Sequence, residues 1–155
     1  MKKFDFIPEG ITDGTVSTWL HTNNETDNLQ DFLNPAIIIC PGGGYSHVSN
    51  REAEPVAAPY YAAGYNTFIL NYSVGEEAKG FKPLLQLAST IAHIRKHAQE
   101  WYIDPSKIAV CGFSAGGHLA CSLGTLYNER AFLDVFKRTD DIRPNAMIQI
   151  GRAHV

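Results

Sequence analysis

Residues 108–120 read Ile-Ala-Val-Cys-Gly-Phe-Ser-Ala-Gly-Gly-His-Leu-Ala, and this stretch decides the fold. It holds Gly-x-Ser-x-Gly between a run typical of a buried strand and a run typical of a helix. A serine on so tight a turn needs almost no side chain two positions away on either side, and Gly112 and Gly116 meet that need. The helix that follows adds the positive end of its dipole, which favours a developing anion. The pattern predicts that Ser114 is a catalytic nucleophile rather than a chance serine in a glycine-rich turn.

Strand-like and helical runs alternate on both sides of this stretch. Apolar or β-branched runs predict strands at 4–7, 16–21, 36–40, 66–71, 107–111 and 146–148. Helical spacing predicts helices at 52–63, which Pro59 should disturb, and at 83–101 and 116–127. The polar residues 22–34 predict a loop, and residues 104–106 a turn. We therefore expect a single α/β domain with a mostly parallel central sheet, helices on both faces and an antiparallel opening pair of strands.

A second glycine-rich turn, residues 41–45 (Pro-Gly-Gly-Gly-Tyr), directly follows the apolar run at 36–40. Acyl transfer needs backbone N–H donors aimed at a tetrahedral oxyanion. One donor usually follows the nucleophile, here Ala115, and we assign the other to Gly43 or Gly44. Tyr45 and His47 come next and are expected to line the pocket. A phosphate-binding loop fits less well, because residues 42–47 lack the third glycine of Gly-x-Gly-x-x-Gly and no Gly-Lys-Ser/Thr ends either turn.

Composition narrows the choice of partners and of compartment. The chain has 155 residues, of which 45% are hydrophobic and 19% charged, with a formal net charge of −3. No run of Lys or Arg indicates a nucleic-acid or anionic-membrane surface, and the longest apolar runs are strand-sized. The expected partner is a small molecule. Cys40, Cys111 and Cys121 all lie in apolar segments, and with no signal-peptide pattern at the start this odd number of thiols predicts a cytoplasmic protein.

Four segments together resemble a known family: residues 41–45, 51–55 (Arg-Glu-Ala-Glu-Pro), 70–72 (Leu-Asn-Tyr) and 112–120. They are similar to those of bacterial acetyl-esterase and acetylxylan-esterase-like α/β hydrolases, relatives of the hormone-sensitive-lipase group. That group usually begins the glycine loop with His, whereas Pro41 stands here and favours the acetyl-esterase side. The resemblance implies a mostly parallel eight-stranded sheet, no metal and no organic cofactor. It also implies hydrolysis of small acyl esters, often acetyl groups on sugars, through an acyl-enzyme on Ser114.

The resemblance further implies a Ser-Asp-His triad whose acid and histidine lie far downstream of the serine. Here only His118 and His154 follow Ser114. His118 lies one turn into the helix and is expected to pack along it as a structural residue, and His154 is the penultimate residue. His93 and His97 are four residues apart on a helix, but no third ligand at metal spacing accompanies them, so we expect no metal site.

The last six residues, Ile-Gly-Arg-Ala-His-Val at 150–155, resemble the translation of a sequencing adapter. We therefore expect residues 1–149 to be the N-terminal part of a single α/β-hydrolase domain and 150–155 to be a non-native tail. The last strands, with the triad acid and base, would then be missing and the chain as given inactive. Two alternatives stay open: a peptidase or amidase of the same fold, and a non-catalytic binding protein that uses the same pocket.

Overall fold

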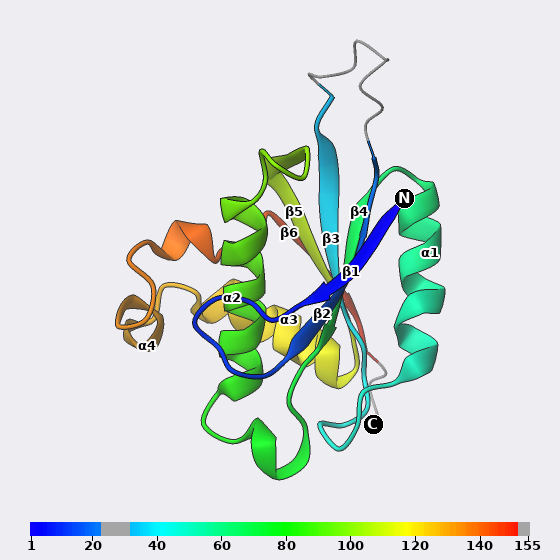
Figure 1. The fold of residues 1–155 in the computed structure, drawn as a ribbon. Helices are drawn as coiled ribbons and strands as arrows, with labels where there is room; N and C mark the ends of the chain where they lie inside the picture. The colour runs from blue at the N-terminus through cyan, green and yellow to red at the C-terminus, as the bar shows by residue number, and fades with distance from the viewer. Residues whose placement is uncertain (23–31, 152–155) are drawn as a thin grey trace.

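The computed structural model describes residues 1–22 and 32–151 (Figure 1). Within these residues, six strands form one sheet in the order β1-β2-β4-β3-β5-β6. Their bounds are β1 Lys2–Phe6, β2 Thr15–Leu20, β3 Asn34–Cys40, β4 Asn66–Asn71, β5 Ile103–Phe113 and β6 Ala146–Ile150. β2 runs antiparallel to β1 and to β4, whereas β3, β4, β5 and β6 run parallel to one another. The predicted mostly parallel sheet and its antiparallel opening pair are confirmed.

Helices cover both faces of the sheet, as the alternation of strands and helices predicts. α1 (Glu54–Ala62) lies on one face, and α2 (Lys82–Lys96) and α3 (Ala115–Leu126) lie on the other (Figure 1). The short α4 (Arg130–Leu133) follows α3. Single 3-10 turns are η1 at Asn50–Glu52, η2 at Gly75–Ala78 and η3 at Thr139–Asp141.

The central strand β3 explains why its sequence is a continuous apolar run. Ile37 and Ile39 join the core cluster under α1, whereas Ile38 joins the larger cluster under α2 and α3. All three isoleucines are fully buried. Because a parallel strand covered by helices has no solvent-facing side, polar alternation disappears from it. Ile38 pairs with Phe68 of β4 and Val110 of β5 in the ladder, so the middle of the sheet is apolar from strand to strand.

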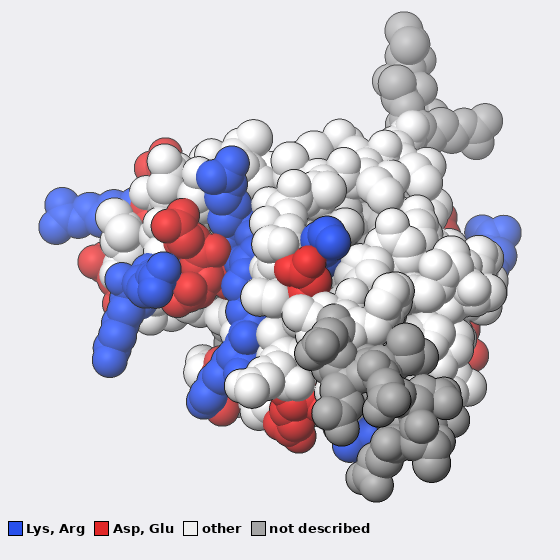
Figure 2. Space-filling view, turned by 90° about the horizontal axis from the view of Figure 1, so that it is seen from above, with Lys and Arg blue, Asp and Glu red and all other residues white. Residues whose placement is uncertain are grey.

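Charged side chains of both signs lie interspersed on the end of the sheet where the parallel strands begin (Figure 2). Wide uncharged areas separate them on the part of this face that the described residues form. This mixed distribution is consistent with the small net charge of −3.

Two predicted boundaries need correction. The helix expected to continue to residue 101 ends at Lys96, and residues 97–102 form turns in which Trp101 N–H donates to the carbonyl of His97. The turn expected at 104–106 lies within β5, where the ladder register shifts and the carboxylate of Asp104 accepts from the N–H and hydroxyl of Ser106. The hydrogen-bonded turn at 104–106 therefore coincides with the irregularity in β5.

Two further expectations concern Pro59 and the loop at 22–34. α1 continues through Pro59, the sixth of its nine residues. Because proline has no N–H, the helix lacks the interior hydrogen bond from position 59 to the carbonyl of Pro55. The loop expected at 22–34 lies largely outside the described residues, and Asn34 already belongs to β3.

Candidate active site

Ser114 stands alone between β5 and α3, as the sequence predicts. Its backbone has φ 50° and ψ −113°, a conformation that a residue with a side chain rarely adopts. The Ser114 N–H donates to the carbonyl of Ile150 over 2.8 Å, and its own carbonyl accepts from His118 N–H over 2.9 Å. The Ser114 side chain is exposed at the carboxyl edge of the sheet. Hydrogen bonds on both sides therefore hold this strained residue in place.

Gly112 and Gly116 make the tight turn possible because backbone atoms occupy the space where their Cβ atoms would be. A Cβ on Gly112 would lie 2.1 Å from the carbonyl oxygen of Gly116. A Cβ on Gly116 would lie 2.0 Å from the carbonyl oxygen of Cys40 at the end of β3. Such separations are far below van der Waals contact, and main chain cannot rotate aside as a side chain can. These close approaches explain why both positions require glycine.

The glycine loop lies against Ser114 because β3 and β5 are adjacent parallel strands whose carboxyl ends meet. Cys40 pairs with Gly112 at the last position of their ladder. A Cβ on Gly42 would lie 3.2 Å from the Cβ of Ser114. Gly43 and Gly44 have φ values of 136° and 61°, which favour glycine. The two glycine-rich turns that sequence analysis singled out therefore meet at one edge.

Some backbone N–H groups at this edge of the sheet have a hydrogen-bond acceptor among the described residues, and others do not. The N–H of Gly42 donates to the carboxylate of Glu52 over 2.7 Å. The N–H groups of Gly43, Gly44 and Ala115 donate to no other group among residues 1–22 and 32–151. The carbonyl of Gly43 accepts from the N–H groups of residues 46 and 47, which closes the loop into a turn. These three backbone donors thus have no acceptor among the described residues.

Two residues that received no role from the sequence hold the glycine loop. Glu52 accepts from Gly42, and the buried hydroxyl of Tyr72 donates to the carbonyl of Pro41. Burial raises the pKa of the Tyr72 phenol, so this hydroxyl keeps its proton and stays a donor. Both residues belong to segments that carry the family resemblance, 51–55 and 70–72. That resemblance was the feature of the sequence that could have identified them.

A cavity of about 360 Å³ opens along α3 from His118 to Leu126, and its lining does not include Ser114. Tyr45 lines it, whereas His47 is absent from its lining and contacts Ser46 through Nδ1 instead. The prediction that His118 packs along α3 is wrong. Its exposed ring lines the cavity and meets the Tyr45 hydroxyl, with 2.9 Å between Oη and Nδ1. Burial raises the pKa of Tyr45, so its O–H donates to Nδ1 when the ring of His118 is neutral.

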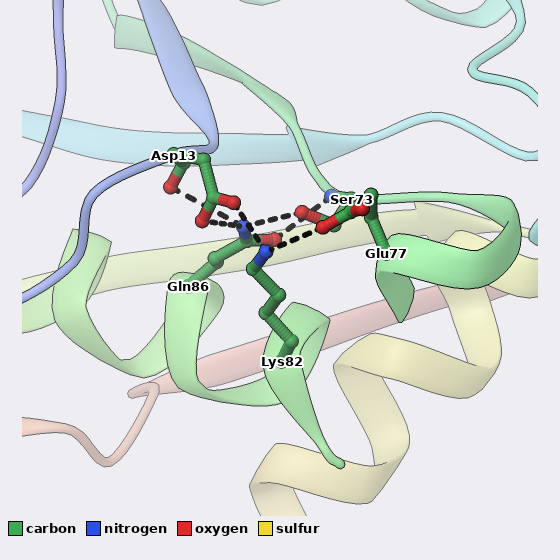
Figure 3. A network of polar contacts seen from close by, with 5 residues as sticks. All are labelled: Asp13, Ser73, Glu77, Lys82 and Gln86. Atoms are coloured by element: carbon green, nitrogen blue, oxygen red, sulfur yellow. Dashed lines mark hydrogen bonds and ion pairs between the residues drawn. The ribbon is translucent and has the colours of Figure 1, made fainter. Parts of the chain in front are cut away.

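A polar network joins α2 to the segment before β2 and to the segment after β4 (Figure 3). The buried amide of Gln86 on α2 accepts from Ser73 N–H and donates to the Ser73 hydroxyl and to Asp13. Lys82 pairs with Asp13 and Glu77, and the hydrogen bond from Lys82 lowers the pKa of the Asp13 carboxyl. The segment after Ser73 then reaches the cavity wall, where Gly75 N–H donates to the Tyr45 carbonyl over 2.6 Å.

A second group of polar side chains lies away from Ser114. His93 and His97 are accompanied by Glu9, and one ligand atom from each residue lies within 4.8 Å of the others. The expectation that no third ligand accompanies the two histidines is therefore wrong. Glu9 precedes them by more than 80 residues, and sequence spacing cannot indicate such a contact. The fold brings them together because the segment after β1 passes the end of α2.

Comparison with known proteins agrees with this geometry. The model of the BD-FAE family matches residues 24–150. The chain belongs to the BD-FAE family. The solved structure of MGS-M1, an α/β hydrolase enzyme from a Medee basin deep-sea metagenome library, has 36% sequence identity and a TM-score of 0.79. That match covers 95% of this BD-FAE chain and 55% of the other. The α/β-hydrolase fold expected from the sequence is confirmed.

Two curated relatives carry names of xylan-degrading enzymes. Endo-1,4-beta-xylanase B of Butyrivibrio fibrisolvens is 30% identical in an alignment of 120 residues that covers 72% of this chain and 19% of that protein. Acetylxylan esterase of Xylanibacter ruminicola is 33% identical over 92 residues, or 59% of this chain and 19% of that protein. The BD-FAE chain thus spans about a fifth of each curated relative. Among its described residues, no helix combines the length and apolar character needed to cross a bilayer.

Proposed function

We propose that this BD-FAE chain carries the nucleophile and oxyanion hole of a serine esterase that cleaves small acyl esters. The observation that carries the proposal is Ser114, exposed and strained at the edge where the glycine loop abuts it. In the proposed reaction the Ser114 Oγ attacks the ester carbonyl carbon and loses its proton to a base. The alcohol then leaves with a proton, and water cleaves the resulting acyl-enzyme.

We assign the oxyanion hole to the backbone N–H groups of Ala115 and of Gly43 or Gly44. Their freedom from other hydrogen bonds among the described residues supports this assignment. Donors of this kind stabilise charge that develops on the carbonyl oxygen, and loss of one costs about 100- to 1000-fold in kcat in a well-studied protease. The Glu52 contact with Gly42 and the Tyr72 contact with Pro41 support the loop in the required shape.

Acetyl esters of sugars are the substrate class that we propose. The cavity beside α3 has about 360 Å³, near the lower end of the range for small-molecule sites. It has a polar wall at Tyr45 and His118 and an apolar wall that includes Leu84 and Leu119. A small acyl group suits the apolar wall, and sugar hydroxyls suit the polar one. The acetylxylan esterase relative bears the name of such an activity.

We further propose that residues 1–155 do not complete the catalytic machinery. A serine without a base has an ordinary alcohol pKa and is a poor nucleophile at neutral pH. His118 is committed to Tyr45, and in this fold the acid and the histidine of the triad follow the nucleophile on later strands. His154 lies outside the described residues. The free cysteines Cys40, Cys111 and Cys121 support a reducing, cytoplasmic location.

The test compares residues 1–155 with a version extended by the downstream coding sequence. We expect the extended protein to hydrolyse 4-nitrophenyl acetate and acetylated xylo-oligosaccharides, and Ser114→Ala to lower kcat by about a millionfold, as in another serine hydrolase. A fluorophosphonate probe should label Ser114 with loss of fluoride. Ser106→Ala is the matched control, since Ser106 is an exposed serine in the first half of β5, at the opposite end of that strand from Ser114.

Three outcomes would contradict parts of the proposal. Labelling that persists in Ser114→Ala would remove the nucleophile assignment. Faster cleavage of alanine 4-nitroanilide than of acetyl esters would favour an amidase. Equal turnover by the short and extended proteins, abolished in the short one by His154→Ala, would show that the chain already contains its base.

A further inference from the structure

Glu9, His93 and His97 come together at the C-terminal end of α2. This end of α2 lies at the opposite end of the sheet from Ser114. α2 leads into the start of β5, whereas Ser114 follows the end of β5. One ligand atom from each of the three residues lies within 4.8 Å of the other two. We propose that these three side chains bind a divalent transition-metal ion of the Zn²⁺ class.

The two histidines are presented in the arrangement that transition metals require. Residues four apart on a helix share a face, and the His93 and His97 ring centroids are 4.4 Å apart. His97 stacks on Trp101 at 5.0 Å, and His93 stacks on Phe6 at 4.4 Å, each with an interplanar angle of 18°. Aromatic packing therefore limits the motion of both rings, which reduces the entropy lost when a metal binds.

Hydrogen bonding leaves both rings suitable for coordination. The carboxylate of Glu100 lies 3.0 Å from Nδ1 of His97. A carboxylate in this position accepts the Nδ1 proton and leaves the Nε2 lone pair for a metal, as in many carboxylate–histidine–metal arrangements. Nδ1 of His93 is buried and has no hydrogen-bond partner among the described residues. The His93 ring is therefore not committed to another polar group.

Lys96 is the competitor for this site. Its ammonium contacts both carboxylate oxygens of Glu9, at 2.8 and 2.7 Å. Each carboxylate oxygen has two lone-pair directions, so Glu9 can bind a metal while it keeps one contact with Lys96. The positive charge of Lys96 opposes a cation nonetheless. Removal of Lys96 should therefore strengthen metal binding, an effect opposite to that of removing a ligand.

The donor set favours a particular class of metal. Two imidazoles and one carboxylate suit Zn²⁺ and its first-row neighbours, whereas Ca²⁺ and Mg²⁺ prefer all-oxygen sites. Three protein ligands leave a fourth position for water. The negative end of the α2 dipole also favours a cation here, because His93 and His97 belong to its last turn and C-cap. Since Glu9 follows β1, the metal would join that segment to α2.

The experiment titrates the untagged chain with ZnCl₂ by calorimetry and with CoCl₂ by visible absorption. We expect one ion per chain. Glu9→Gln should weaken binding by about tenfold or more, and Glu100→Gln by about 10- to 100-fold at most. His93→Phe and His97→Phe, which retain an aromatic ring for stacking, should abolish binding at matched concentrations. Lys96→Met should strengthen it. His47→Ala, an exposed histidine outside the cluster, is the control and should change nothing.

Two results would overturn the proposal. One is the absence of 1:1 binding by the parent chain at metal concentrations that saturate known zinc proteins. The other is binding that Glu9→Gln and Lys96→Met leave unchanged, since the metal would then sit on the histidine pair alone. Glu9 and Lys96 are exposed, so both variants should retain the fold, which circular dichroism checks. Because the site lies apart from Ser114, esterase activity is not part of this test.

Discussion

The two ends of the central sheet are built in different ways. At the carboxyl end, Ser114, Gly43, Gly44 and Tyr45 all have positive φ, and the important groups are backbone N–H donors. At the other end, Trp101 packs against aromatic and histidine rings from three parts of the chain: Phe4, Phe6, Phe68, His93 and His97. One end therefore depends on main-chain shape and the other on side-chain packing.

This difference has a consequence for mutation. A substitution at the packed end removes buried surface and lowers the stability of the whole domain, but it leaves the backbone at Ser114 unchanged. A substitution at the carboxyl end removes little surface but changes the positions of the backbone donors. Stability and activity should therefore respond differently at the two ends.

Replacing Trp101 should have the largest effect on stability. Its side chain is 7% exposed and lies at the centre of the packed end. Trp101→Ala should lower the free energy of unfolding by about 3–5 kcal/mol, the usual cost of removing a buried tryptophan. Urea denaturation measures this loss, with the exposed neighbour Tyr102→Ala as control. If this substitution in the extended protein also lowered the esterase activity per folded molecule, the two ends of the sheet would not be independent.

Gly116→Ala should have the next largest effect, at the carboxyl end. Its new Cβ would meet the Cys40 carbonyl, so the glycine loop and α3 must separate at a cost of about 3 kcal/mol. Gly124→Ala on the same helix is the matched control. Its Cβ would meet the Met147 thioether, a flexible side chain that can move aside, and alanine also favours helix over glycine. Equal destabilisation by the two variants would show that the close approach at Gly116 carries no special cost.

Glu52→Ala should have the smallest effect on stability and a selective effect on the loop. It leaves the Gly42 N–H without its acceptor and should cost about 1 kcal/mol. Hydrogen exchange at the Gly42 amide should become faster, while exchange in β3 stays slow. In the extended protein kcat should fall more than KM rises. Glu52→Gln retains an acceptor oxygen and should restore most of the protection. Unchanged exchange in Glu52→Ala would mean that the loop holds its shape without this contact.

Local sequence predicted the strands, the turn at Ser114 and the need for Gly112 because each depends on contacts between near neighbours. The motif also predicted Gly116, although the backbone that this glycine approaches is that of Cys40 in the neighbouring strand. The boundaries of helices and strands were predicted less accurately where a residue distant in the sequence packs against the end of the element. α2 ends at Lys96 although apolar spacing continues to Trp101, because Trp101 turns back to pack under Phe4 and Phe6. The prediction that the His118 ring packs along α3 was wrong for the same reason, since its hydrogen-bond partner Tyr45 lies 73 residues away in the sequence.

The sequence by itself determined the α/β-hydrolase fold and the candidate nucleophile, because periodicity and glycine spacing act over a few residues and restrict the backbone directly. Tertiary structure alone decided which groups hold the glycine loop, which side chains line the cavity and that Glu9 meets His93 and His97. Those contacts depend on the order of strands in the sheet and on the path of loops between them. A side chain's chemistry is visible in the sequence, but its partner is visible only after the chain has folded.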